Sequence, residues 1–320
     1  MQQINTTISG QEVLIVLPDD YSAARTYYLI EFCHGMGADE QSLLFRPDIL
    51  NAMLPMGYLF CASHAHGDNW GNDAALADYA ALESYMRANY SISHLAMWGG
   101  SMGGPSALVH AATSPISAVK GACLIYPVCN LGAMYNDLDW ADDSINIAYN
   151  IPGGGSYATQ TAGHDPMLRA TSEYAGKRFR FTHSPDDTFV PKATNSDAFA
   201  AKVTSVAAEM TVLPISGEHG AEDGLVVADV VAFYERCCRV LDSITLSTSV
   251  TAQAPSLVRQ AVLEISSIAV NVGLYAPAVA EGRFIAPALS VAVEAQTPAM
   301  QSARVPVAHH ARQMAFRRNA

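Results

Sequence analysis

The sequence predicts an α/β protein in which a mainly parallel sheet is covered by helices on both faces. Two observations predict this class. Residues 11–241 alternate short apolar runs with amphipathic segments, the pattern of a parallel sheet built from crossover units. Residues 74–90 carry the clearest amphipathic segment, with apolar side chains repeating at a period near 3.6. A chain of 320 residues that is 50% hydrophobic is also long enough to bury a complete core.

The elements follow in order along the chain. Short, mostly apolar runs bounded by turn residues predict strands at residues 12–17, 27–33, 58–63, 95–98, 121–126, 178–183 and 209–215. Helices are expected between them. The helix over 74–90 has Asn72 and Asp73 as capping residues, and further helices are expected over 105–112 and 225–241.

About fifty residues separate the strand ending near 126 from the strand starting near 178, more than a crossover helix requires. We therefore expect a small lid insertion at about residues 127–177. Within it, residues 135–143 predict a short acidic helix, and the Pro-Gly-Gly-Gly-Ser run at 152–156 predicts a flexible loop.

The composition changes after residue 244, which predicts a domain boundary between residues 1–244 and residues 245–320. The later segment holds six Arg and three Glu in 76 residues, a net charge of +3, whereas residues 1–244 carry −15. Apolar and small side chains alternate over residues 289–295, which predicts a strand. This β-rich segment of low charge is interpreted either as an assembly or docking segment or as a linker.

Composition excludes several functions. The net charge of −12 disfavours binding to nucleic acid or to an anionic membrane surface. The first residues have no basic flank and no apolar run, so we expect no signal peptide, and no segment predicts membrane insertion. The protein is therefore expected to be soluble and cytoplasmic when synthesised. The six cysteines form neither a CxxC motif nor a disulfide framework, so we expect small buried side chains.

Residues 98–104, Trp-Gly-Gly-Ser-Met-Gly-Gly, place a serine between glycines where a predicted strand becomes a predicted helix. This is the layout of a nucleophile elbow, a strained turn whose close backbone contacts leave no room for Cβ atoms. Gly99 and Gly103 stand two residues before and after Ser101. Ser101 is thus the candidate nucleophile.

A nucleophilic serine needs a histidine that accepts its proton and a carboxylate that orients the histidine. In this type of sheet their chain order is Ser, acid, His. Asp186 and Asp187 follow the strand predicted at 178–183, and His219 follows the last predicted strand. Because the carboxyl ends of parallel strands converge on one crevice, these loops are expected to meet.

With these motifs in order, residues 11–241 resemble the α/β-hydrolase fold, particularly its esterase and prolyl-oligopeptidase-like branches. The family acid precedes a Val-Pro pair by a spacing that Asp187 fits and Asp186 does not, so the resemblance implies Asp187 as the acid and His219 as the base. It also implies an oxyanion hole formed by two backbone N–H groups. The loop His34-Gly35-Met36-Gly37 resembles the family loop, so these donors are expected at Met36 and Met102.

Five residues are expected to line the substrate pocket: His34, Trp70, Tyr126, Tyr135 and Trp140. The His64-Ala65-His66-Gly67-Asp68 run has the HxHxD spacing of some hydrolytic metal sites, but the sequence offers no further ligands. These residues are interpreted as part of a loop near the crevice. No metal and no cofactor is expected.

The sequence therefore predicts a serine hydrolase that cleaves a carboxylic ester through an acyl-enzyme. A peptidase or amidase, and a hydrolase-shaped structural or binding component without turnover, are the alternatives. The sequences of residues 286–289 and 291–298 resemble the low-complexity ends of minor tail proteins of actinobacterial phages. That resemblance implies a virion-associated enzyme acting on esters of the host envelope, with residues 245–320 contacting tail partners or further copies of the chain.

Overall fold

The structure is a computed structural model that describes residues 1–114, 119–220 and 225–238 together with four later strands. Contacts between residues divide the chain into two units, Met1–Thr245 and Leu246–Ala320. The later strands belong to the second unit: β9 (Ala269–Gly273), β10 (Val279–Ala280), β11 (Arg283–Phe284) and β12 (Ser290–Glu294).

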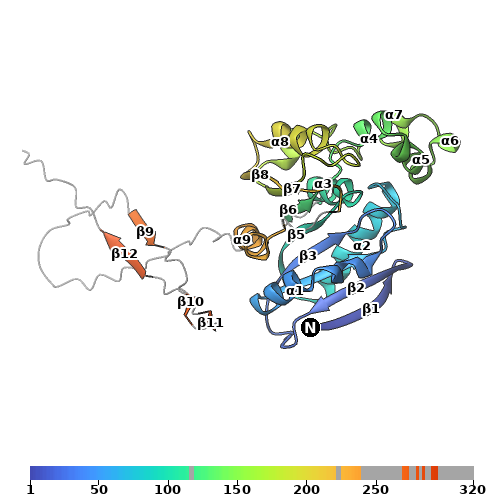
Figure 1. The fold of residues 1–320 in the computed structure, drawn as a ribbon. Coiled ribbons are helices and arrows are strands. Elements are labelled where there is room, and N and C mark those ends of the chain that lie inside the picture. Colours follow the sequence, from blue (N-terminus) through green and yellow to red (C-terminus); the bar gives the residue numbers. More distant parts are fainter. Residues whose placement is uncertain are drawn as a thin grey trace, which may run out of the picture. The chain divides into compact units, whose positions relative to one another are not determined.

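In the first unit, eight strands form one sheet in the order β1-β2-β4-β3-β5-β6-β7-β8 (Figure 1). Their bounds are β1 (Gln2–Ile8), β2 (Gln11–Leu17), β3 (Tyr27–Cys33), β4 (Tyr58–Ser63), β5 (Ile92–Gly100), β6 (Val119–Ile125), β7 (Arg178–His183) and β8 (Glu209–Pro214). Strand β1 is antiparallel to β2, and β2 is antiparallel to β4, whereas the pairs from β4 to β8 are parallel. The predicted α/β class and its mainly parallel sheet are confirmed.

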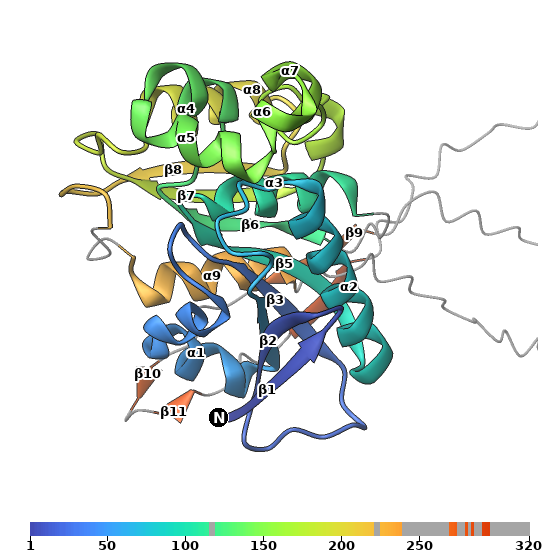
Figure 2. The ribbon, with the colours of Figure 1, turned by 90° about the vertical axis from the view of Figure 1, so that its right-hand side faces the viewer.

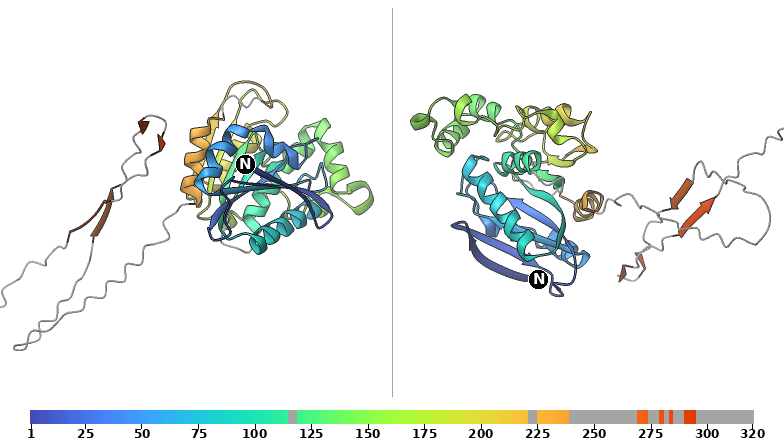
Figure 3. Two further views of the ribbon diagram at one scale, coloured as in Figure 1. Left: turned by 90° about the horizontal axis from the view of Figure 1, so that it is seen from below. Right: turned by 180° about the vertical axis from the view of Figure 1, so that it is seen from behind.

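Helices cover both faces of this sheet (Figure 3). On one face, side chains of α2 (Asp73–Asn89), α3 (Gly103–Thr113) and α8 (Ala198–Val203) join a core cluster with the strands. On the other face, α1 (Pro47–Met53) and α9 (Val227–Cys238) form a second cluster. Burial on both faces explains why the central strands are continuous apolar runs.

The capping of α2 follows the sequence expectation. The side chain of Asn72 accepts a hydrogen bond from Ala75 N–H at 3.0 Å, which satisfies one of the free donors at the helix start. The six cysteines are buried, as expected. Among the described residues, no helix has both the length and the apolar character needed to cross a bilayer.

The lid insertion, expected at about residues 127–177, is largely helical. It contains α4 (Leu131–Asp137), α5 (Asp139–Ala148), α6 (Ile151–Gly154), α7 (Tyr157–Gln160) and the short helix η3 (Thr171–Tyr174). Figure 2 shows α4 to α7 grouped on the β7–β8 side of the sheet. The flexible loop predicted at 152–156 is wrong, because Ile151–Gly154 form a short helix and the side chain of Ser156 caps α7.

In the second unit, β9 pairs with β12 and β10 pairs with β11, both antiparallel. The strand expected at residues 289–295 is β12. Residues 245–268 and 295–320 lie outside the described residues, and the assembly role of the segment stays a prediction.

Candidate active site

Ser101 stands at the turn between β5 and α3, with a backbone φ of 49° in the left-handed region. Its N–H donates to the carbonyl of Ile125 at 3.1 Å, and its own carbonyl accepts from Gly104 N–H at 2.9 Å. These bonds hold a conformation that costs energy for a residue with a side chain. The turn presents Ser101 Oγ at the carboxyl end of the sheet, as an elbow does.

The glycines around Ser101 are required by close contact with neighbouring backbone. A Cβ at Gly99 would lie 2.3 Å from the carbonyl oxygen of Cys33, and a Cβ at Gly103 would lie 2.2 Å from the same atom. Both positions follow from the sequence motif. The adjacent Gly100 and Gly104 are equally constrained, by the carbonyls of Ile125 and Val128, although the motif does not require glycine there.

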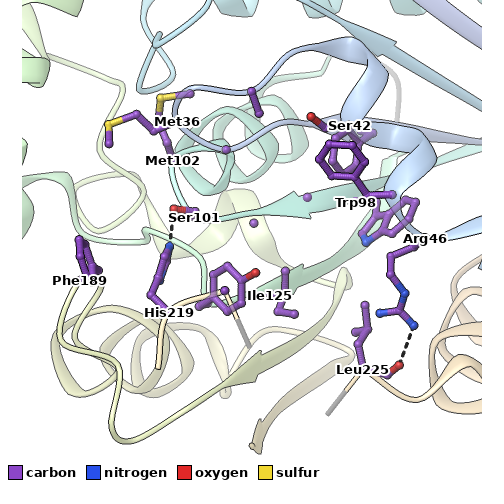
Figure 4. Close-up of a pocket in the computed structure, with 18 of the residues that line it drawn as sticks. Met36, Ser42, Arg46, Trp98, Ser101, Met102, Ile125, Phe189, His219 and Leu225 are labelled. Atoms are coloured by element: carbon purple, nitrogen blue, oxygen red, sulfur yellow. Dashed lines mark hydrogen bonds between the residues drawn. The ribbon is translucent and has the colours of Figure 1, made fainter. Parts of the chain in front are cut away.

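The structure brings the three predicted catalytic side chains together, and Figure 4 shows the contact between Ser101 and His219. Ser101 Oγ lies 2.9 Å from His219 Nε2, and His219 Nδ1 lies 2.8 Å from Asp187 Oδ2. Asp186, the weaker candidate for the acid, is exposed, whereas Asp187 is buried. The side chains come from the ends of β5, β7 and β8, which meet at one edge of the sheet.

Asp187 accepts hydrogen bonds on both carboxylate oxygens. Oδ1 accepts from the N–H groups of Phe189 and Val190, and Oδ2 faces His219 on one side and His183 Nε2, at 3.3 Å, on the other. Burial alone would raise the pKa of Asp187, but the hydrogen bonds from His183, His219 and Val190 together hold it well below its ordinary value. The carboxylate is thus kept charged, as an orienting acid must be.

The sequence argument missed the part played by His183. This side chain is fully buried at the end of β7, with Nε2 2.8 Å from the carbonyl of Val190 and Nδ1 2.6 Å from Ser196 Oγ. Since the carbonyl can only accept, Nε2 carries a proton that also faces Asp187. The signal in the sequence was a histidine four residues before the acid, at the end of the same strand.

The backbone N–H groups of Met36 and Met102, the two predicted oxyanion donors, have no hydrogen-bond acceptor among the described residues. The loop after β3 approaches closely, since a Cβ at Gly35 would lie 3.6 Å from Ser101 Cβ. Asp68 fixes this loop by accepting from Gly37 N–H at 2.6 Å. Two free amides beside a nucleophile are what an oxyanion hole requires.

A cavity of about 360 Å³ opens at Ser101 and His219. Among the residues predicted to line it, Trp70, Tyr126 and Trp140 do so. Two others do not, and the prediction for them was wrong. His34 is buried behind the loop, where its ring nitrogens contact the carbonyls of Gly35 and His64, and Tyr135 stacks on Tyr157 with 4.3 Å between ring centroids.

The polar side chains of the HxHxD run point to separate partners. His66 Nδ1 lies 2.6 Å from Asp78 Oδ2, His64 Nδ1 lies 3.9 Å from Glu40 Oε2, and Asp68 holds the loop at Gly37. Within the described residues, no group of three or more His, Cys, Asp or Glu side chains is arranged to hold a metal ion. The side chains of the HxHxD run thus hold neighbouring segments in place and do not converge on one point.

Comparison with known proteins identifies the fold. No family model matches the chain, and no curated protein matches it. Among solved structures it is similar to the fluorophosphonate-binding serine hydrolase F of Staphylococcus aureus, with 16% identity and a TM-score of 0.57 over 72% of this chain and 97% of that one. It is similar to esterase 2 of Thermogutta terrifontis, with 17% identity and a TM-score of 0.54 over 71% and 88%.

Peptidases share the same fold over a smaller part of their length. For the acylaminoacyl peptidase of Pyrococcus horikoshii, the identity is 12% and the TM-score 0.57, over 74% of this chain and 41% of that one. The chain therefore spans less than half of that peptidase. These likenesses show an α/β-hydrolase fold. The resemblance of residues 245–320 to phage tail proteins finds no support in these comparisons.

Proposed function

We propose that the chain is a serine hydrolase that cleaves a small carboxylic ester through an acyl-enzyme. The observation that carries this proposal is the pair of contacts that links Asp187 to His219 and His219 to Ser101 Oγ, both within 2.9 Å. A serine so placed beside a histidine is an activated nucleophile. The cavity of about 360 Å³ at Ser101 supports a small-molecule substrate.

In the first half of the reaction, Ser101 Oγ attacks the ester carbonyl while His219 Nε2 takes the hydroxyl proton. The buried Asp187 carboxylate holds His219 in orientation and stabilises the imidazolium that forms. The amides of Met36 and Met102 receive the negative oxygen, each worth on the order of 3 kcal/mol. His219 then returns the proton to the leaving alcohol, and water repeats the sequence to release the acid.

The test is hydrolysis of 4-nitrophenyl acetate and butanoate, together with labelling by a fluorophosphonate. Wild type should turn over at least one of these esters and be labelled at Ser101, while Ser101→Ala should lose both, with kcat falling by at least about 10⁴-fold. A wild type that is inactive and unlabelled would identify a structural or binding module. Faster turnover of matched anilides than of esters would instead identify an amidase or peptidase.

A further inference from the structure

We propose that the cavity divides at Ser101 into two arms, and that the acyl group of the ester enters the arm along β5. That group would be uncharged, apolar or aromatic, and limited in length. The inference rests on the proposed ester hydrolysis and names its substrate class. Two groups of apolar side chains that line the cavity define the arms. In Figure 4, Phe189 lies on one side of Ser101, and Trp98 and Ile125 lie on the other.

The first group, called here the acyl arm, consists of Phe32, Trp98 and Ile125. Trp98 lies three residues before Ser101 on β5, and its ring packs edge-on against Phe32 with 5.2 Å between centroids. It also packs against Phe60 at 6.1 Å. The wall of this arm is therefore rigid and apolar, because its largest side chain is fixed by two others.

The second group, called here the alcohol arm, consists of Trp70, Trp140 and Phe189. Their ring centroids form a chain, with 6.0 Å from Trp70 to Trp140 and 5.7 Å from Trp140 to Phe189. Phe189 continues the chain to His219 at 5.9 Å. Since half of Phe189 is exposed, this arm opens to solvent beside the histidine.

Proton transfer decides which part of the ester enters which arm. His219 Nε2 must reach the leaving oxygen in order to protonate it, so the alcohol leaves on the His219 side, toward Phe189. The carbonyl oxygen is held at the amides of Met36 and Met102. The remaining substituent of the carbonyl carbon, the acyl group, is then directed away from His219, along β5 toward Trp98.

Arg46 and Leu225 lie at the end of the acyl arm away from Ser101 (Figure 4). Both residues line the cavity, and Arg46 Nη2 donates to the carbonyl of Leu225 at 3.0 Å. The guanidinium also forms a two-point contact with the Asp48 carboxylate, at 3.0 and 2.7 Å. Its charge is thus matched within the protein, so the arm selects a neutral acyl group although an arginine lies at its end.

The volume of the cavity limits the length of the acyl group. A cavity of about 360 Å³ is near the lower end of the range for small-molecule sites, and both arms share it. Trp98 takes up part of the acyl arm. We therefore assign Trp98 as the residue that determines acyl specificity.

The experiment measures kcat/KM for 4-nitrophenyl esters with a constant leaving group and acyl groups from acetyl to decanoyl, with benzoyl and the adipate half-ester added. Wild type should favour butanoyl or benzoyl over decanoyl by at least about tenfold, and hexanoyl over the adipate half-ester by a similar factor. Trp98→Leu should move the optimum to longer chains, raising the decanoyl-to-butanoyl ratio about tenfold.

Trp140→Leu is the matched control, because the same change is made in the alcohol arm. It should leave the acyl optimum in place and change the ratio between methyl and phenyl butanoate. Trp98→Phe, which keeps an aromatic ring, should shift the acyl optimum in the same direction as Trp98→Leu. It replaces Trp98→Leu in the test if Trp98→Leu does not fold.

The outcomes separate the two proposals. An acyl profile that is unchanged in folded Trp98 variants but shifted in Trp140→Leu overturns the assignment of the arms, while ester hydrolysis itself stands. Equal turnover of hexanoyl and adipate esters overturns the neutral acyl class. Absence of turnover for every ester, with Ser101 unlabelled, removes the proposed function.

Discussion

The carboxylate of Asp187 accepts from two backbone N–H groups and faces two histidines, and these histidines have different roles. His219 is partly exposed at the cavity and faces Ser101, whereas His183 is fully buried and faces the backbone of Val190 and the side chain of Ser196. His219 can therefore exchange protons with a substrate. His183 is a positioning residue, because it touches the acid and not the reacting atoms.

Replacing His183 should therefore change the pH dependence of the proposed reaction. His183 stabilises the charged form of Asp187, and without it the pKa of Asp187 rises and the carboxylate becomes more basic. A more basic carboxylate holds the His219 imidazolium more tightly. In His183→Leu we expect the acid limb of kcat/KM to move to higher pH by about 0.5 to 1 unit.

His183→Gln is the control, since its side-chain amide can donate in place of Nε2. His183→Gln should bring the acid limb of kcat/KM back toward its wild-type position. A purely structural role would lower activity at every pH and leave the limb unmoved in both variants, which is the result that contradicts this prediction.

The turn from β5 into α3 is an element whose conformation depends on close backbone contact. Gly103→Ala would place a Cβ 2.2 Å from the carbonyl oxygen of Cys33, so α3 or the loop after β3 must move. Met102 directly precedes α3 and Met36 lies in the loop after β3, so either movement displaces a proposed oxyanion donor. We expect a loss of about 1–3 kcal/mol in the free energy of unfolding, measured by urea denaturation, together with a large loss of ester turnover.

Gly132→Ala is a matched glycine change in a helix of the lid insertion. A Cβ at Gly132 would meet its nearest atoms at 3.5 Å, an ordinary contact distance. Its stability and activity should remain close to wild type. Equal losses in the two variants would show that the elbow has no special steric constraint.

A buried group of charged side chains joins β3 to α2 and α3. Glu31 is fully buried, His110 Nε2 lies 3.6 Å from its Oε2, and the same nitrogen lies 3.1 Å from Glu83 Oε2. Burial raises the pKa of Glu31 to about 8, against an opposing effect of His110. Folded Glu31 therefore binds a proton that the unfolded chain releases near pH 4.3.

Stability linked to Glu31 is fully present below about pH 4.3 and is lost as the pH rises through about 8. Glu31→Gln removes this loss, so its Tm relative to wild type should increase between pH 5 and pH 8. Thermal unfolding across this range is the measurement, with Glu12→Gln as a control on an exposed residue. A constant difference in Tm between Glu31→Gln and wild type would contradict the linkage.

Elements differ in how far the sequence could predict them. Strands β2 to β6 are mostly apolar because helices cover both faces, and this apolar pattern predicts strands. Strand β1 was missed because its Gln, Asn and Thr side chains are largely exposed on the antiparallel side of the sheet. The short helix Ile151–Gly154 was missed because glycine runs usually mark loops, whereas here Ile151 belongs to a hydrophobic cluster with side chains of α4 and α5.

At the scale of the molecule, sheet topology assembles the site from loops far apart in the sequence. The strand order reverses at β3, with β4 on one side and β5 on the other, and such a reversal opens a crevice at the carboxyl edge. Chain order and turn chemistry predicted Ser101 and the loops that converge there, and the family resemblance selected Asp187 over Asp186. Side-chain orientation was not readable, and for that reason His34 and Tyr135 were wrongly expected in the cavity.

The proposed active site lies wholly within the first unit, and this leads to a prediction about the chain as a whole. Ser101, Asp187 and His219 all belong to Met1–Thr245, which has its own core clusters on both faces of the sheet. A chain ending at Thr245 should therefore fold with a Tm within a few degrees of the full chain and be labelled by a fluorophosphonate at the same rate.

The same truncation tests the assembly role predicted for residues 245–320. Light scattering after size-exclusion chromatography should give a monomer for the truncated chain, whatever the state of the full chain. If both chains form the same oligomer, association resides in the first unit and the assembly role is wrong. If the truncated chain is folded but unlabelled, Ser101 depends on the second unit, and the independence of the catalytic unit is refuted.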